Sequence, residues 1–223
     1  MVKVGNCFDN WELENMVPKT LCVFLLDNSG SMSGKKIDDL NKGLQQFYQD
    51  IHEDEAWSRR IEVAIISFET DVHYLQQPSI VENFTMPTLT AMGATNMVGG
   101  IQKAIEVVNE RKQYYREKEI PYKRPWIIMV TDGFANVDSI KDQVKKDQWN
   151  KRYYFQPFAV DEDADLNVLN SLAGWKVLSF KEMSTLEFFN ALSYGIGKYS
   201  TVNQSDDSSF DNSTIDWFSD FTI

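Results

Sequence analysis

The sequence predicts an α/β protein of the Rossmann-like type, with a central, mostly parallel sheet, one antiparallel edge strand and helices on both faces. Three observations lead to this fold class. Nearly continuous apolar runs alternate with segments of helical periodicity, and polar residues follow directly after two of the runs. The length of 223 residues and the hydrophobic content of 43% suit one substantial domain.

The predicted strands are the apolar runs at residues 21–26, 63–68, 126–131 and 154–160. These runs are typical of parallel strands that are covered on both faces, because they do not alternate with polar residues. A shorter run at 72–75 follows the turn residues 69–71 and indicates a hairpin with an antiparallel edge strand. Residues 175–180 are expected to form the last strand.

The segments between the strands have apolar residues spaced by three and four positions, as on one face of a helix. The three stripes are Ile37, Leu40, Leu44, Phe47 and Ile51; Ile101, Ala104, Ile105 and Val108; and Leu186, Phe189, Leu192 and Ile196. Because right-handed crossovers join parallel strands, such helices are expected on both faces of the sheet.

We expect a single domain at 18–198, preceded by an N-terminal segment, 1–17, and followed by an acidic tail, 199–223. The tail is rich in Ser and Asp and has no Lys, Arg or Glu. Its composition is typical of a frayed terminus, but its interspersed aromatic residues also fit an arm that docks on a groove.

The net charge of -11 argues against nucleic acid and anionic membranes as partners, since both would repel so acidic a protein. No stretch approaches the roughly 20 apolar residues needed to span a bilayer, and the first residues lack the apolar core of a secretory signal. Cys7 and Cys22 do not resemble a disulfide framework. We therefore expect a cytoplasmic protein with reduced cysteines.

Oxygen-bearing side chains gather where two predicted strands end. Asp27, Ser29 and Ser31 follow the first strand, and Asp132 follows the strand at 126–131. Thr95 lies in a glycine-containing loop before the helix of Ile101. The carboxyl ends of parallel strands share one sheet edge, and residues at i, i+2 and i+4 of an extended loop point the same way. Mg²⁺ prefers such oxygen ligands, so the pattern predicts a divalent-cation site.

The pattern Asp-x-Ser-x-Ser, a distant Thr and a later Asp resembles the von Willebrand factor type A domain with its metal-ion-dependent adhesion site (MIDAS). The resemblance covers about residues 18–198. It implies that Ser29, Ser31 and Thr95 coordinate Mg²⁺ or Mn²⁺ directly, while Asp27 and Asp132 act largely through water. It also implies one coordination position for a partner's carboxylate, and hence a protein-binding module rather than an enzyme.

Within that family, residues 25–32, 122–133 and 158–165 are similar to the bacterial TerY-like proteins linked with tellurite resistance. This resemblance implies a cytoplasmic protein in a metal or tellurite stress complex, with a protein kinase or a phosphatase among its neighbours.

Other interpretations of the same residues compete. Asp and Ser after a strand also cap helices, and an enzyme could use the same cation to bind a phosphate ester. Residues 30–36 lack the spacing and the final Ser or Thr of a P-loop. Ser29 and Ser31 lack a nucleophile elbow. His52 and His73 are interpreted as solvated residues.

Two further groups are assigned to structural roles or to the surface. Asp161, Asp163 and Asp165 imitate the start of an EF-hand loop, but Leu replaces the required Gly and Glu at 166 and 172. These aspartates are therefore interpreted as helix-start carboxylates. Three tyrosines are candidates for exposed contact residues: Tyr114, Tyr115 and Tyr122.

Overall fold

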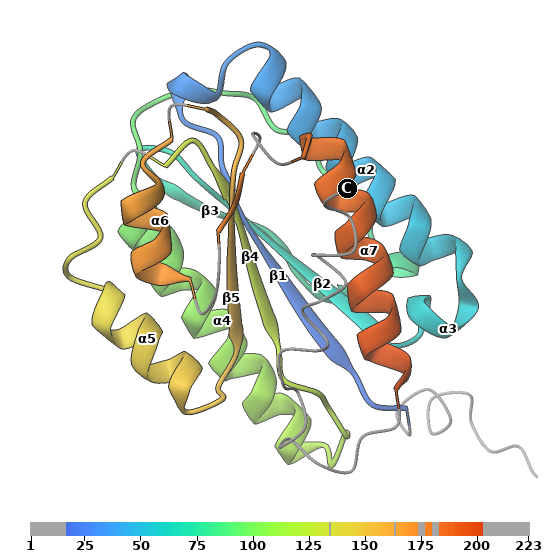
Figure 1. Ribbon diagram of the computed structural model, residues 1–223. Coiled ribbons are helices and arrows are strands. Elements are labelled where there is room, and N and C mark those ends of the chain that lie inside the picture. The colour runs from blue at the N-terminus through green and yellow to red at the C-terminus, as the bar shows by residue number, and fades with distance from the viewer. Residues whose placement is uncertain (1–16, 134, 163, 174–176, 180–182, 203–223) are drawn as a thin grey trace, which may run out of the picture.

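The computed structural model describes residues 17–133, 135–162, 164–173, 177–179 and 183–202. Within them lies a six-stranded sheet of order β3-β2-β1-β4-β5-β6 (Figure 1). The strands are β1 (Thr20–Asp27), β2 (Ile61–Phe68), β3 (Val72–Ile80), β4 (Trp126–Thr131), β5 (Tyr154–Ala159) and β6 (Leu178–Ser179). Only the edge pair β2–β3 of this described sheet is antiparallel, which confirms the predicted fold class.

Helices cover both faces of the sheet. The described helices are α2 (Lys35–Glu53), α3 (Glu55–Ser58), α4 (Met97–Glu117), α5 (Lys141–Trp149), α6 (Leu166–Leu172) and α7 (Thr185–Thr201), with short 3-10 turns η1 (Gly30–Met32) and η2 (Val81–Asn83). In Figure 1, α2, α3 and α7 lie on one side of the sheet, and α4, α5 and α6 lie on the other. None of the described helices combines the length and apolarity required to cross a membrane.

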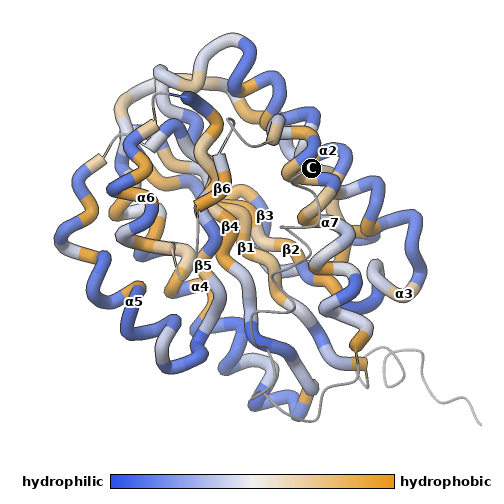
Figure 2. The backbone as a smooth tube through the Cα atoms, in the orientation of Figure 1, coloured by the Kyte–Doolittle hydropathy of each residue, from blue (hydrophilic) through white to orange (hydrophobic). Residues whose placement is uncertain are grey.

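Burial on both faces explains the continuous apolar runs. Along β1, Cys22, Phe24 and Leu26 pack into the core beneath α2 and α7, whereas the alternate residues Leu21, Val23 and Leu25 join the core beneath α4 and α5. The central strands accordingly appear mainly hydrophobic and α5 mainly hydrophilic in Figure 2. Every residue of β1 is buried, so its sequence carries no period of two.

A close contact fixes α2 against α7. Phe24 meets Phe47 of α2 edge to face at 4.9 Å and lies 5.8 Å from Phe189 of α7. A Cβ at Gly43 would approach the Phe189 ring to 2.2 Å. Glycine is therefore required at this point of α2 by the aromatic ring of the neighbouring helix, although glycine costs helix stability elsewhere.

The element bounds differ from prediction mainly at the edges. β3 continues to Ile80, well past the predicted 72–75, and only 178–179 of the predicted 175–180 form a described strand. The closing helix α7 ends at Thr201, three residues beyond the predicted domain boundary. Cys7 and nearly all of the predicted terminal segments lie outside the described residues, whereas Cys22 is a buried free thiol, as predicted.

A buried ion pair ties α4 to the sheet and corrects the prediction for Tyr115. Arg111 donates two hydrogen bonds of 2.7 Å to the carboxylate of Glu62 in β2, and the Tyr115 hydroxyl donates a third, of 2.5 Å. Burial and the charge of Glu62 raise the pKa of Tyr115 well above its usual value. Tyr115 is therefore fully buried rather than a surface residue, whereas Tyr114 is 37% exposed.

We expect Arg111→Ala to lower the free energy of unfolding by about 3 kcal/mol, because it leaves the Glu62 carboxylate buried without its counter-charge. Arg59→Ala is the matched control, since the Arg59–Glu55 pair lies at the surface and should contribute less than about 1 kcal/mol. Urea unfolding monitored by circular dichroism measures both. Equal losses in the two variants would contradict the importance of the buried pair.

Candidate metal centre

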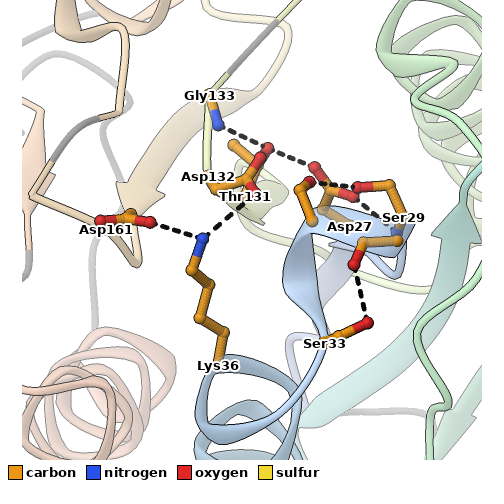
Figure 3. A network of polar contacts seen from close by, with 10 residues as sticks. Asp27, Ser29, Ser33, Lys36, Thr131, Asp132, Gly133 and Asp161 are labelled. Carbon is orange, nitrogen blue, oxygen red and sulfur yellow. Dashed lines mark hydrogen bonds and ion pairs between the residues drawn. The ribbon is translucent and has the colours of Figure 1, made fainter.

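The candidate site lies at the carboxyl ends of β1 and β4. These strands are parallel neighbours, with Leu26 opposite Val130 in the register. The residues that follow, Asp27 and Asp132, are therefore brought to the same sheet edge, as predicted. Figure 3 shows Asp27 close to Ser29 and Thr131, Asp132 close to Thr131, and the start of α2 beside them.

Asp27 is held by donors from two elements. Its Oδ1 accepts a hydrogen bond of 2.9 Å from the Ser29 backbone amide, and its Oδ2 accepts one of 2.6 Å from the Thr131 hydroxyl. The Thr131 oxygen in turn accepts a 3.0 Å hydrogen bond from the Gly133 amide. Asp27 is fully buried, so this chain of hydrogen bonds fixes the orientation of its carboxylate.

Burial is the main cause of an elevated Asp27 pKa. The negative charge of Asp132 adds to the increase, while the hydrogen bonds from Ser29 and Thr131 oppose it. The two buried carboxylates repel one another. A cation placed between them and solvent reduces this repulsion and stabilises both charges. The electrostatics of this sheet edge therefore favour binding of a positive ion.

Ser29 and Ser31 are brought together by a turn, not by the extended loop expected from their spacing. Ser29 has extended backbone angles, φ -62° and ψ 165°, and the 3-10 turn η1 begins at the next residue. This turn places the two hydroxyl oxygens 3.0 Å apart. Ser29 is buried and Ser31 is exposed, so the pair leads from the buried carboxylates to the surface.

The serines do not cap the following helix. The N-cap residue of α2 is Gly34, and no side chain provides a capping hydrogen bond there. Ser29 precedes η1 but likewise makes no side-chain cap bond. The helix-cap interpretation of this cluster is therefore wrong, and the two hydroxyls are available for another role.

The loop that carries Thr95 lies against the serine loop. The Met92 amide donates to the Asn28 carbonyl at 2.8 Å, and the Gly30 amide donates to the Gly93 carbonyl at 3.0 Å. Thr95 is partly buried. No hydrogen bond within the described residues joins Thr95 to the other four predicted ligands, so its role as a ligand stays a prediction.

The turn between β2 and β3 supports that loop from behind. The Ala94 amide donates to the Thr70 hydroxyl at 3.0 Å, and the Asn96 amide donates to the Glu69 carbonyl at 2.6 Å. The Glu69 carboxylate is bound by His73 and by the Thr70 amide, and these hydrogen bonds lower its pKa to about 2. His73 therefore has a structural partner, and it is 48% exposed.

Asp132 has one oxygen in an ion pair and one without a partner. Its Oδ2 lies 3.4 Å from Lys36 Nζ, while its buried Oδ1 has no hydrogen-bond partner among the described residues. Lys36 Nζ also lies 2.5 Å from Asp161 Oδ2. Burial lowers the pKa of Lys36, but the hydrogen bond to Asp161 and the two nearby negative charges more than offset it, so the pKa is raised overall.

The acidic cluster after β5 therefore has two separate roles. Asp165 caps α6 by accepting hydrogen bonds from the amides of Asn167 and Val168, as its interpretation as a helix-start carboxylate predicts. For Asp161 that interpretation is wrong, because its carboxylate pairs with Lys36 instead. Asp163 lies outside the described residues.

Three residues of this site were not predicted: Thr131, Lys36 and Asp161. Thr131 could have been identified from the sequence, because it places a hydroxyl at the last position of an otherwise apolar buried strand, directly before Asp132. The ion pair of Lys36 with Asp161 joins residues far apart in the chain, and no local pattern indicates it.

The donor set fits a hard divalent cation. Within the described parts of the chain, no group of three or more His, Cys, Asp or Glu side chains is suited to hold a metal, so a cation here needs hydroxyl ligands. Carboxylate and hydroxyl oxygens suit Mg²⁺, Mn²⁺ and Ca²⁺. Asp132 Oδ1, which has no partner among the described residues, and the paired Ser29 and Ser31 hydroxyls offer oxygens of this kind.

We expect Gly93→Ala to weaken metal affinity by about tenfold or more, the usual loss when the support of a ligand is disturbed. Gly93 has φ +67°, and a Cβ there would lie 2.1 Å from Glu69 Oε2 and 2.6 Å from Thr70 Oγ1. The loop carrying Thr95 would have to shift. Titration calorimetry with Mn²⁺ measures the effect.

Gly34→Ala is the control for this prediction, because Gly34 has a similar φ of +77° but open space around its Cβ position. It should reduce stability by about 1–3 kcal/mol through backbone strain alone, because its ψ of -132° lies outside the left-handed helical region, and it should retain metal affinity. An equal loss of affinity in both variants would count against the steric role of Gly93.

Comparison with known proteins identifies relatives of this chain. Residues 22–134 match the family model described as von Willebrand factor type A domain. Inter-alpha-trypsin inhibitor heavy chain H3 of Mus musculus is 33% identical over 129 residues, and that of Homo sapiens is 30% identical over 131 residues. The matches cover 54% and 55% of this chain but only 14% of each relative.

Solved structures share the fold at low identity. The vWF domain of the type V pili tip protein Mfa5 from Porphyromonas gingivalis has a TM-score of 0.58 at 11% identity, covering 86% of this chain and 99% of that one. Proximal thread matrix protein 1 from the mussel byssus, with a zinc-occupied MIDAS motif, has a TM-score of 0.54 at 12% identity, covering 82% and 46%.

Proposed function

The chain belongs to the von Willebrand factor type A domain family, and from this premise we propose that it is a divalent-metal-dependent protein-binding module. In this proposal Ser29, Ser31 and Thr95 hold Mg²⁺ or Mn²⁺, and Asp27 and Asp132 orient it largely through water. The bound cation supplies one coordination position for a carboxylate of the partner. Two observations carry the proposal: Asp132 Oδ1 is buried without a partner among the described residues, and the Ser29 and Ser31 hydroxyls are paired at the same sheet edge.

The hydrogen bonds of Asp27 support an orienting role for this residue. Both of its oxygens already accept hydrogen bonds from Ser29 and Thr131. A carboxylate held in this way contributes charge and geometry without needing a direct bond to the cation. The neutral hydroxyls then provide the direct ligands, which is the division of roles that the MIDAS resemblance implies.

The proposed partner is a protein that presents Asp or Glu next to an apolar side chain. Met92 is 55% exposed, and its amide is bonded to Asn28 in the serine loop. In the proposal, this exposed side chain provides the apolar contact for the partner. The net charge of -11 disfavours nucleic acid and anionic membranes, whereas a cation at the rim would attract a carboxylate locally.

We further propose that the module acts in a bacterial metal or tellurite stress complex in the cytoplasm, with a kinase or a phosphatase as partner. The support is the likeness of residues 25–32, 122–133 and 158–165 to TerY-like proteins. Metal-dependent pull-down of a purified candidate kinase or phosphatase tests this part of the proposal.

Metal should stabilise the wild-type fold. At a concentration of about 100 times Kd, a ligand selective for the native state adds about 2.7 kcal/mol, so the melting temperature should rise saturably with Mg²⁺ or Mn²⁺. Ser29→Ala/Ser31→Ala should abolish the rise. Ser33→Ala is the control, because the Ser33 hydroxyl donates to the Gly30 carbonyl instead of facing the serine pair. Absence of a metal response in the wild type would overturn the proposed function.

Binding of acidic peptides should need both metal and an oriented Asp27. We expect peptides containing Glu to bind the full chain in Mg²⁺ and to dissociate in EDTA, in Asp27→Asn or when Glu is replaced by Gln. Fluorescence anisotropy of labelled peptides measures this. Equal binding of the Gln peptides would contradict carboxylate recognition. Metal-dependent turnover of p-nitrophenyl phosphate that is lost in Asp27→Asn would instead favour a phosphoester-binding enzyme.

A further inference from the structure

Lys36 links the proposed metal centre to the loop after β5. It lies in the first turn of α2, and its ammonium group is 3.4 Å from Asp132 Oδ2 and 2.5 Å from Asp161 Oδ2 (Figure 3). The Asp132 side chain is 1% exposed, whereas those of Lys36 and Asp161 are 28% and 27% exposed. One cation is thus shared between a buried carboxylate and a partly exposed one.

Lys36 is shared unevenly between the two carboxylates. The shorter contact is to Asp161, and the contact to the buried Asp132 is long for an ion pair. A divalent cation oriented by Asp132 would be repelled by the ammonium group and would compete with it for the same carboxylate. The flexible four-carbon stem of lysine allows the ammonium group to move toward Asp161.

We propose that Lys36 is an internal competitor of the divalent cation, and that Asp161 holds the Lys36 ammonium away from Asp132. This inference rests on the proposed function and adds to it a residue pair that sets the metal affinity. The divalent cation and the Lys36 ammonium group compete for Asp132. The pairing of Lys36 with Asp161 sets how strongly Lys36 competes.

Lys35 provides a matched control. It is adjacent in sequence and carries the same charge, but its side chain is 79% exposed and pairs with Asp39 on the same helix. A general effect of net charge would make substitution of the two lysines equivalent. Direct competition at Asp132 requires Lys36 alone to matter.

The experiment is Mn²⁺ titration calorimetry on the full chain with Lys36→Met and Lys35→Met, because Met retains most of the apolar stem. Lys36→Met should bind Mn²⁺ about three- to tenfold more tightly than the wild type, as expected for removal of a nearby unit charge, and Lys35→Met should change affinity by less than about twofold. Equal changes in the two variants, or weaker binding by Lys36→Met, would overturn the inference.

Asp161→Asn supplies the second arm of the test. In the wild-type background it should weaken Mn²⁺ binding several-fold, because Lys36 then interacts with Asp132 alone. In the Lys36→Met background the same substitution should have a clearly smaller effect, since no competitor remains to be held away. Additive effects of the two substitutions would contradict the role of Asp161 in holding Lys36.

Melting temperatures distinguish failure of this inference from failure of the proposed function. In EDTA, Lys36→Met should melt below Lys35→Met, because Asp132 loses its counter-charge, and Mn²⁺ should raise its melting temperature by more than that of the wild type. If no variant and no wild-type sample responds to Mn²⁺, the metal site itself is disproved. If all respond equally, the site stands and only the competition by Lys36 is disproved.

Discussion

The site is organised by the burial of two carboxylates at neighbouring strand ends. Asp27 and Asp132 are almost completely removed from solvent, and each is positioned by a strand that is itself buried on both faces. Removing charges from water is costly unless hydrogen bonds or opposite charges compensate. The surrounding polar groups meet this requirement for Asp27, which accepts hydrogen bonds from Ser29 and Thr131. They meet it only in part for Asp132, because Lys36 lies beside its Oδ2 while its Oδ1 has no partner among the described residues.

The sheet makes this arrangement possible because β1 and β4 are parallel, adjacent and in close register. Their side chains alternate between two cores, one beneath α2 and α7 and the other beneath α4 and α5. This double burial leaves the strand backbones little freedom to shift. The β2–β3 turn then supports the Thr95 loop through Glu69 and Thr70, so three strand ends contribute to one surface region.

Much of the fold and of the site's location could be predicted from sequence, because both depend on local patterns. Continuous apolar runs identify doubly buried strands, and Asp27 and Asp132 follow such runs directly. The misjudged features depend on contacts between distant segments. The burial of Tyr115 depends on Glu62, and the role of Asp161 depends on Lys36. The turn at Ser29 also differs from the expected extended loop, because η1 forms against the backbone of Gly93.

The internal hydrogen bonds of Asp27 also affect how tightly the proposed site would hold its ion and how quickly it would exchange it. Both oxygens of this carboxylate are already engaged within the protein, so in the proposed site an arriving ion would meet mainly neutral hydroxyls and the remaining oxygen of Asp132. Sites with few charged ligands hold divalent ions less tightly than sites built from several carboxylates. If the proposed site binds a cation, it would exchange that ion readily, and its occupancy would follow the concentration of free cation in the surrounding solution.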